Sequence, residues 1–128
     1  MMTVLDTHAL VWWATKNKRL TKAARREIER SKRRGVAAIS LWEVAHLIGR
    51  GKLRIDVDSE SWLEELLACD RVELLPLTAA IAARSCALGA FHGDPADRLI
   101  VATALVHGAR LVTADTAIHD SRVVESVW

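Results

Sequence analysis

The sequence lacks the features that mark several common classes of protein. No apolar run approaches the ~20 residues that a membrane-spanning helix needs. Residues 1–16 have an acid at position 6 and no basic start, so they make a poor signal peptide. The chain has no P-loop, no GxGxxG motif and no plausible Ser-His-Asp set. Two cysteines, Cys69 and Cys86, have neither metal-binding nor redox spacing, and we expect reduced core thiols in a cytoplasmic protein.

The histidines and tryptophans do not form a recognisable site either. No histidine pair has H-x-x-x-H or H-E-x-x-H spacing, so we expect most of them at the surface or beside a site. These histidines are His8, His46, His92, His107 and His119. We expect the tryptophans to fill the core or a dimer face rather than to stack on bases. They are Trp12, Trp13, Trp42, Trp62 and Trp128.

What is present suits one soluble, globular domain over residues 1–128. The chain is 51% hydrophobic and 27% charged, and its length is enough to bury a core. Its charge is unevenly distributed. Residues 16–34 hold ten of the 18 lysines and arginines but only two acids, so this segment carries +8 and the remainder −6. Such a segment suits a polyanionic partner or a solvated helix face, and composition does not choose between them.

Short apolar runs alternate with helical patterns along the chain. We expect strands at 3–5, 36–39, 72–76 and 110–115, with an edge strand within 122–128. We expect helices at 8–14, 22–33, 40–51, 61–68, 79–90 and 95–107, with Gly35 ending the second and Asp58 or Ser59 capping the fourth. This alternation predicts a three-layer α/β/α sandwich around a mostly parallel sheet of about five strands. In such sheets, sites lie beyond the carboxyl ends of strands.

Five acids stand near these expected strand ends or helix starts. Each has an ordinary structural explanation. Asp94 suits an N-cap before Pro95, and Asp97 lies in the first turn of the same helix. Glu43 has capping-box spacing from Ser40. The other two, Asp6 and Asp115, follow apolar strands, where they could simply form turns.

Taken together, the five acids predict a different arrangement. Strands ending in Asp6 and Asp115 should both lie inside the sheet, which would bring these acids close together. The same edge would receive Glu43, Asp94 and Asp97. Crowded carboxylates repel one another unless a cation neutralises them. Oxygen-only ligands suit Mg²⁺ or Mn²⁺.

The chain resembles the PIN-domain family, and specifically the VapC-type ribonuclease toxins of toxin–antitoxin pairs. LDTHALVWW resembles the family's opening strand with its first acid, and ISLWEVAHL the region of its second. HGDPADRLIVATAL and LVTAD resemble the regions of the third and fourth acids. The resemblance implies Asp6, Glu43, Asp97 and Asp115 as catalytic metal ligands, with Asp94 joining or supporting the metal site. Flanking positions that would orient acids or touch phosphate are Thr7, Ser40, Arg98 and Thr113.

This resemblance implies a PIN-like fold and a Mg²⁺- or Mn²⁺-dependent endoribonuclease that hydrolyses RNA through metal-activated water. It also implies a homodimer and a cognate antitoxin. The +8 segment, through Arg25, Arg26 and Arg30, could hold the RNA backbone. The alternative is a catalytically silent domain of the same fold that binds RNA or protein. A receiver-like signalling domain is disfavoured because Asp6 is followed by Thr7 and no lysine occurs after Lys52.

Overall fold

The computed structural model describes residues 1–89 and 93–128. The sheet has five strands, all parallel, in the order β3-β2-β1-β4-β5. The strands are β1 (Met2–Leu5), β2 (Arg33–Ala37), β3 (Val72–Leu75), β4 (Arg110–Val112) and β5 (Ser126–Val127). The described helices are α1 (Thr7–Ala14), α2 (Lys22–Arg30), α3 (Ala38–Gly49), α4 (Ser59–Leu67), α5 (Ala79–Cys86), α6 (Pro95–Val106) and α7 (Thr116–Ser121). The predicted sheet of about five mostly parallel strands is confirmed, and all of its described strands are parallel.

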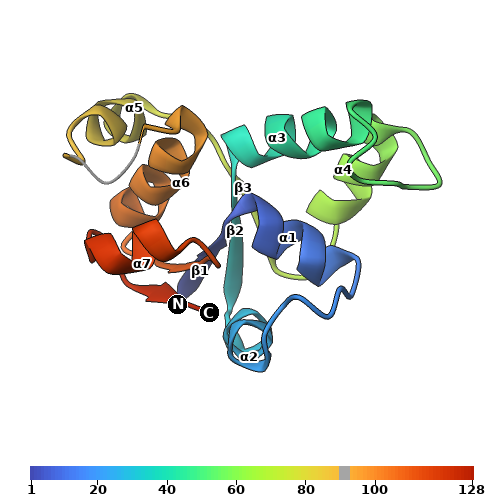
Figure 1. Cartoon of the computed structure of the whole chain (residues 1–128), viewed down its shortest axis with the longest axis horizontal. Coiled ribbons are helices and arrows are strands. Elements are labelled where there is room, and N and C mark those ends of the chain that lie inside the picture. The colour runs from blue at the N-terminus through green and yellow to red at the C-terminus, as the bar shows by residue number, and fades with distance from the viewer. Residues whose placement is uncertain (90–92) are drawn as a thin grey trace.

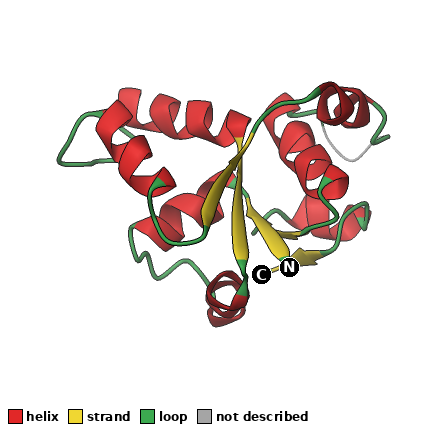
Figure 2. Ribbon diagram, turned by 180° about the vertical axis from the view of Figure 1, so that it is seen from behind, coloured by secondary structure: helices red, strands yellow, loops and turns green. Residues whose placement is uncertain are grey.

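Helices cover both faces of this sheet. Figure 1 shows α5, α6 and α7 on one side of the strands and α1, α3 and α4 on the other, with α2 at the far end. The view from behind shows the same three layers (Figure 2). No helix in the described part of the chain has the length and apolarity needed to cross a membrane. The predicted α/β/α sandwich is therefore the observed fold.

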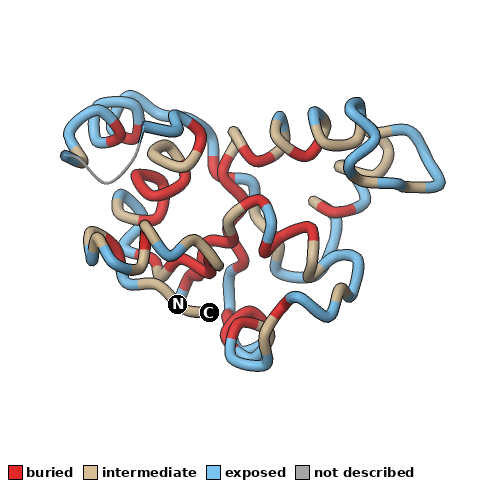
Figure 3. Tube along the Cα trace, viewed as in Figure 1, coloured by how far each residue is buried: buried red, intermediate tan, exposed pale blue. Residues whose placement is uncertain are grey.

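The core lies on both faces of the strands, as the residue alternation requires. Along β1, Val4 packs with α6 and Leu5 packs with α1. Along β4, Leu111 packs on the same face as Val4, and Val112 packs on the same face as Leu5. All four side chains are fully buried. Buried segments follow the strands and the inner sides of the helices (Figure 3). A sheet covered on both faces explains why the central strand β1 is buried along its whole length.

Strand β2 begins three residues earlier than predicted, and the following helix, α3, begins two residues earlier. Residue Gly35 lies inside β2 and does not end a helix, because α2 stops at Arg30. A β-carbon on Gly35 would lie 2.7 Å from Cδ1 of Leu75, so the close approach of β3 explains this glycine. Since α3 begins at Ala38, the predicted strand at 36–39 is wrong in its second half.

Three further expectations need correction. Ser40 is not an N-cap, because the N-cap position of α3 is Ala37, which makes no side-chain capping bond. Both cysteines are free, but Cys69 and Cys86 are exposed rather than in the core. Helix α5 ends at Cys86 instead of continuing to residue 90. The remainder of that predicted helix reaches residue 90, which, like His92, lies outside the described residues.

Candidate functional site

The carboxyl ends of neighbouring strands β1 and β4 open into a pocket of about 440 Å³. All five acids singled out from the sequence line this pocket, although they come from four different segments of the chain. The lining comprises Asp6, Thr7, His8, Trp12, Arg19, Glu43, Asp94, Asp97, Ala114 and Asp115. Convergence of the acids follows from the parallel sheet, because parallel strands end at the same edge.

Asp6 is held at the centre of this edge. Its backbone N–H donates to the carbonyl of Val112 (3.0 Å), which ties it to β4. Its Oδ1 accepts from the N–H of Ala9 (2.8 Å) and so caps α1, while Oδ2 accepts from the hydroxyl of Thr113. Burial raises the pKa of Asp6, with the nearby Asp115 adding to the rise, and the bonds from Thr113 and Ala9 oppose it. The fold therefore favours neutralisation of this carboxylate by a proton or a cation.

Glu43 is positioned by two hydroxyls rather than by a capping box. The hydroxyl of Thr7 lies 2.5 Å from Oε1 of Glu43 and 3.1 Å from the hydroxyl of Ser40. A hydroxyl has one proton and a carboxylate only accepts. The Thr7 proton therefore belongs to Glu43, and the Ser40 proton completes the contact with Thr7. Both hydroxyl residues are buried, so they form a fixed mount that joins α1 to α3.

The start of α6 carries the other two acids. Asp94 is its N-cap, and Oδ1 accepts from the N–H groups of Ala96 (2.9 Å) and Asp97 (3.3 Å). Pro95 occupies the first turn, as predicted. Asp94 is exposed, whereas Asp97 is half-buried. Arg98 does not line the pocket: its guanidinium donates to the carbonyls of Ser85 (3.1 Å) and Gly89 (2.8 Å) and ties α6 to the end of α5.

A network behind Asp115 includes a histidine that sequence reasoning did not single out. Asp115 caps α7, and its own N–H donates to Oγ1 of Thr113 (3.1 Å). Nε2 of His119 lies 2.6 Å from the carbonyl oxygen of Thr113, and Nδ1 lies 2.5 Å from the hydroxyl of Ser126. Because a carbonyl only accepts, Nε2 carries the proton. His119 thus fixes Thr113, whose hydroxyl holds Asp6. In the sequence, the signal that could have identified His119 is its position four residues after Asp115.

Aromatic and basic side chains form the wall of the pocket contributed by α1 and the segment that follows it. The ring of Trp12 lies 5.7 Å from that of His8 and 5.6 Å from that of Trp128. The guanidinium carbon of Arg19 lies 5.9 Å from the Trp12 ring centre. None of these side chains was predicted as part of the site, because their approach depends on the path of the chain after α1.

The donor chemistry of the pocket fits a hard divalent cation. Its acids offer oxygen ligands, and the rise in the pKa of Asp6 shows a carboxylate that would gain from a nearby positive charge. Across residues 1–89 and 93–128, no three His, Cys, Asp or Glu side chains are gathered tightly enough to hold an ion by themselves. Mg²⁺ commonly keeps several water ligands and takes only one or two carboxylates from a protein. The pocket therefore fits an ion held partly through water.

The predicted RNA-binding arginines lie elsewhere. Helix α2 packs at the amino ends of the strands, where Glu27 accepts from Thr3 (3.1 Å) and from Arg110 (3.2 Å). Of the three arginines, Arg25 lines a separate pocket of about 420 Å³ with Trp13 and Trp62, and Arg26 and Arg30 are exposed. The structure does not bring these arginines to the acidic pocket.

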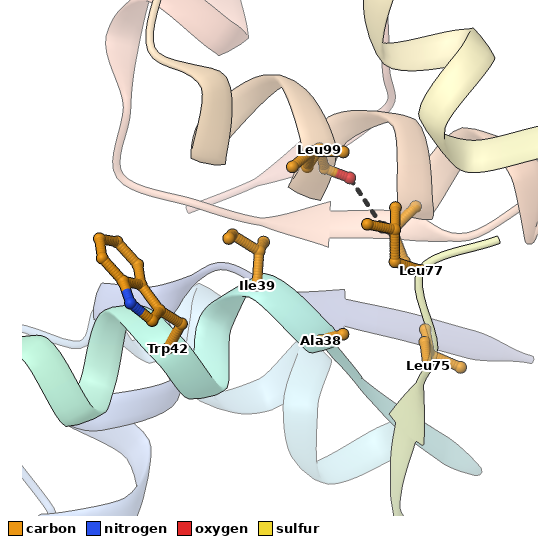
Figure 4. A pocket seen from close by; sticks show the side chains of 7 residues that line it. Ala38, Ile39, Trp42, Leu75, Leu77 and Leu99 are labelled. Carbon is orange, nitrogen blue, oxygen red and sulfur yellow. Dashed lines mark hydrogen bonds between the residues drawn. The ribbon is translucent and has the colours of Figure 1, made fainter. Parts of the chain in front are cut away.

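A third hollow, of about 210 Å³, is apolar. It lies between α3, α6 and the end of β3 and is lined by Ala38, Ile39, Trp42, Leu75, Leu77, Leu99 and Thr103 (Figure 4). Two of its large side chains are well exposed, Trp42 at 59% and Leu77 at 58%. The Trp42 ring stacks on His46, with ring centres 4.9 Å apart. Exposed apolar surface of this kind commonly marks a protein contact.

Comparison with known proteins agrees with this architecture. Residues 3–122 match the PIN domain family. The chain is 42% identical over 120 residues to Ribonuclease VapC22 of Mycobacterium tuberculosis, covering 93% of this chain and 91% of that protein. Among solved structures, VapBC2 from Rickettsia felis bound to a promoter DNA fragment is 20% identical, with a TM-score of 0.72 and coverage of 98% and 97%. A toxin–antitoxin complex from Klebsiella pneumoniae is also 20% identical, with a TM-score of 0.65 and coverage of 89% and 87%. The chain therefore belongs to the PIN-domain family, in the group that includes the VapC proteins.

Proposed function

We propose that this protein is a Mg²⁺- or Mn²⁺-dependent endoribonuclease and the toxin of a toxin–antitoxin pair, with residues 1–128 forming one PIN domain. The observation that carries the proposal is the gathering of five carboxylates from separate segments at the carboxyl edge of the sheet. Its 42% identity to a protein named as a ribonuclease supports the same activity. The likeness to a toxin–antitoxin complex supports an antitoxin partner.

In this proposal, Asp6, Glu43, Asp97 and Asp115 hold the cation, and Asp94 acts as the N-cap of α6 beside them. When bound, the cation would lower the pKa of a water molecule and offset the charge of the RNA phosphate. The chain's own contribution is to hold its acids still. Two of them, Asp6 and Asp115, are each fixed by helix-capping bonds, and Asp6 also accepts from Thr113.

The supporting hydroxyls act through these acids. Thr7 orients Glu43, and Ser40 holds Thr7, so both are positioning residues rather than ligands. Thr113 does the same for Asp6. Arg98, which the resemblance placed beside the acids, would act only by fixing where α6 begins. Such preorganisation is what a hydrolytic site needs, because misplaced ligands lose transition-state stabilisation.

Two further parts of the proposal concern partners. We propose that Arg25, Arg26 and Arg30 contact a long RNA away from the bond that is cleaved, because α2 lies at the opposite end of the strands. We also propose that the homodimer uses the apolar hollow around Trp42 and Leu77, since this hollow combines exposed and apolar side chains.

The decisive experiment is cleavage of total cellular RNA with Mg²⁺, with Mn²⁺ and with EDTA, followed by mapping of the new ends. We expect cleavage only with a divalent ion, leaving 5′-phosphate and 3′-hydroxyl ends. The Asp97→Asn variant should be inactive under all three conditions. If the wild-type protein binds RNA but never cleaves it, the silent RNA-binding alternative replaces this proposal.

A further inference from the structure

One wall of the acidic pocket, formed by Trp12 and Arg19, is aromatic and basic rather than acidic. Trp12 is half-buried, with Trp128 and His8 packed against it, yet it still lines the pocket. Arg19 is exposed and lies over the same indole. An indole supported by other rings keeps its position, because its neighbours restrict its rotamers. The wall therefore presents a fixed aromatic surface with a cation beside it.

This wall lies a short way from the acids. Trp12 is six residues after Asp6 on the helix that Asp6 caps, which corresponds to about 9 Å along the helix axis. Both residues line the same hollow. An RNA strand passing through the pocket would therefore meet both the acids and the Trp12 surface.

Charge separates the two sides of the pocket. Within the part of the chain that the structure describes, Arg19 is the lining residue with a permanent positive charge, and five lining residues are carboxylates. Phosphate groups are repelled by carboxylates and attracted by guanidinium. The Arg19 side of the pocket is therefore where the phosphate next to a reacting one finds a favourable partner.

We propose that Trp12 and Arg19 form a nucleotide subsite, in which the base of a nucleotide flanking the cleaved bond stacks on Trp12 and its phosphate contacts Arg19. Single-stranded RNA is commonly bound in this way, through aromatic rings and arginine. The inference rests on the proposed ribonuclease function and adds how the substrate is held. For Trp12, it departs from the expectation that the tryptophans fill the core or a dimer face.

A segment of the antitoxin is the competing occupant. A peptide that blocks an acidic pocket would present a cation to the carboxylates, and Arg19 would repel that cation. A ring face beside a guanidinium instead matches a base attached to a phosphate. The geometry thus favours a nucleotide on this wall.

The first test compares Trp12→Phe with Trp12→Leu. Trp62→Leu serves as the control, because Trp62 is a half-buried tryptophan that lines another pocket. The substrate is a short single-stranded RNA, either intact or with one abasic nucleotide placed at each position in turn. Cleavage is followed as kcat/KM with Mg²⁺, and binding as fluorescence anisotropy in EDTA.

For the wild type, we expect removal of one flanking base to weaken binding about 5- to 150-fold, the range for loss of one stacked base. Trp12→Leu should weaken binding of intact RNA similarly and make binding indifferent to the abasic position. Trp12→Phe should retain most of the preference, and Trp62→Leu all of it. Thermal unfolding of each variant shows that the fold is kept. If Trp12→Leu weakens intact and abasic RNA equally, Trp12 supports the fold and binds no base.

The second test concerns Arg19. Arg19→Gln should reduce the slope of log K against log salt concentration by about 0.7, the value for one phosphate contact on a single strand. Lys52→Gln, at an exposed residue outside both the pocket lining and the +8 segment, should leave the slope unchanged. Equal slopes for both variants would overturn the role of Arg19. Failure of the proposed function is separate: the wild type would then cleave no RNA, while anisotropy would still decide whether the base and phosphate are bound.

Discussion

Thr113→Val tests whether one buried hydroxyl holds the centre of the site. The substitution nearly conserves shape at a fully buried position and removes a hydroxyl with two partners. That hydroxyl donates to Oδ2 of Asp6 and accepts from the N–H of Asp115. A hydrogen bond to a charged group contributes about 1.5–3 kcal/mol, and an unsatisfied buried N–H costs about 1–3 kcal/mol. Asp115 is only half-buried, so its N–H costs less than a fully buried one. We therefore expect the free energy of unfolding at neutral pH to fall by about 2–4 kcal/mol.

The loss should also depend on pH. Burial raises the pKa of Asp6 in the folded protein, so its carboxylate destabilises the fold progressively as pH rises from the unfolded-state pKa through the folded-state pKa. The bond from Thr113 opposes this rise, and without it the pKa of Asp6 should increase further. At pH values where Asp6 is protonated in both states, this part of the difference disappears. The effect of Thr113→Val should therefore be larger at pH 7 than in acid.

Urea unfolding in EDTA, at neutral and acidic pH, measures this effect. Thr103→Val is the matched control, because Thr103 is also buried but its hydroxyl donates only to the carbonyl of Leu99 within the same helix (2.7 Å). We expect the control to lose less than about 1 kcal/mol at either pH. Equal losses for the two variants, independent of pH, would refute the role assigned to Thr113.

Three other predictions follow from the same geometry. Asp97→Asn should abolish RNA cleavage while leaving the melting temperature in EDTA unchanged or higher, because one of several crowded charges is removed; a clear drop would mean that Asp97 serves the helix alone. Joint charge reversal of Arg25, Arg26 and Arg30 should weaken binding of long RNA more at low salt than at high salt, and leave cleavage of a short oligonucleotide unchanged. Leu77→Asp should convert a dimer to a monomer in sedimentation, and an unchanged mass would place the dimer contact elsewhere.

The sequence predicted the arrangement of the acids better than it predicted their local roles. Asp6 and Asp115 were expected together because both follow inner strands of a parallel sheet, and topology alone brings such positions to one edge. Asp94 was correctly expected as an N-cap, since Asp-Pro at a helix start has few other uses. These inferences depend only on where strands end and helices begin, and the pattern of apolar and polar residues indicates both.

Errors arose where one pattern fits two structures. Ser40 and Glu43 have the spacing of a capping box, yet the same spacing places two side chains on one face inside a helix. Here α3 begins at Ala38, so both residues face Thr7. A buried strand followed directly by a buried helix leaves no polar boundary in the sequence, which is why residues 36–39 were misassigned.

Trp12, Arg19 and His119 were missed for another reason. Their contacts depend on helix rotation and on the path of the chain between α1 and α2 and after β4. No local periodicity encodes the contacts of Trp12 and Arg19, and for His119 the spacing of four residues from Asp115 is the one local signal. Composition also misled, because a tryptophan packed against other rings looks like core until the pocket beside it is known.

Three of the five pocket acids are also helix N-caps, and this double use shapes how the activity can be lost. Asn and Asp cap helices about equally well, whereas Ala at the same position costs about 1 kcal/mol. A change of Asp6 or Asp115 to Asn therefore preserves the start of α1 or α7 while removing a charge from the proposed cation site. Asp and Asn codons differ by a single base. A host that must survive an uncontrolled toxin gene thus has a short mutational route to a folded, inactive protein. We expect Asp→Asn variants at Asp6 and Asp115 to be inactive and to keep nearly wild-type stability, whereas the Asp→Ala variants should be inactive and also lose about 1 kcal/mol of stability.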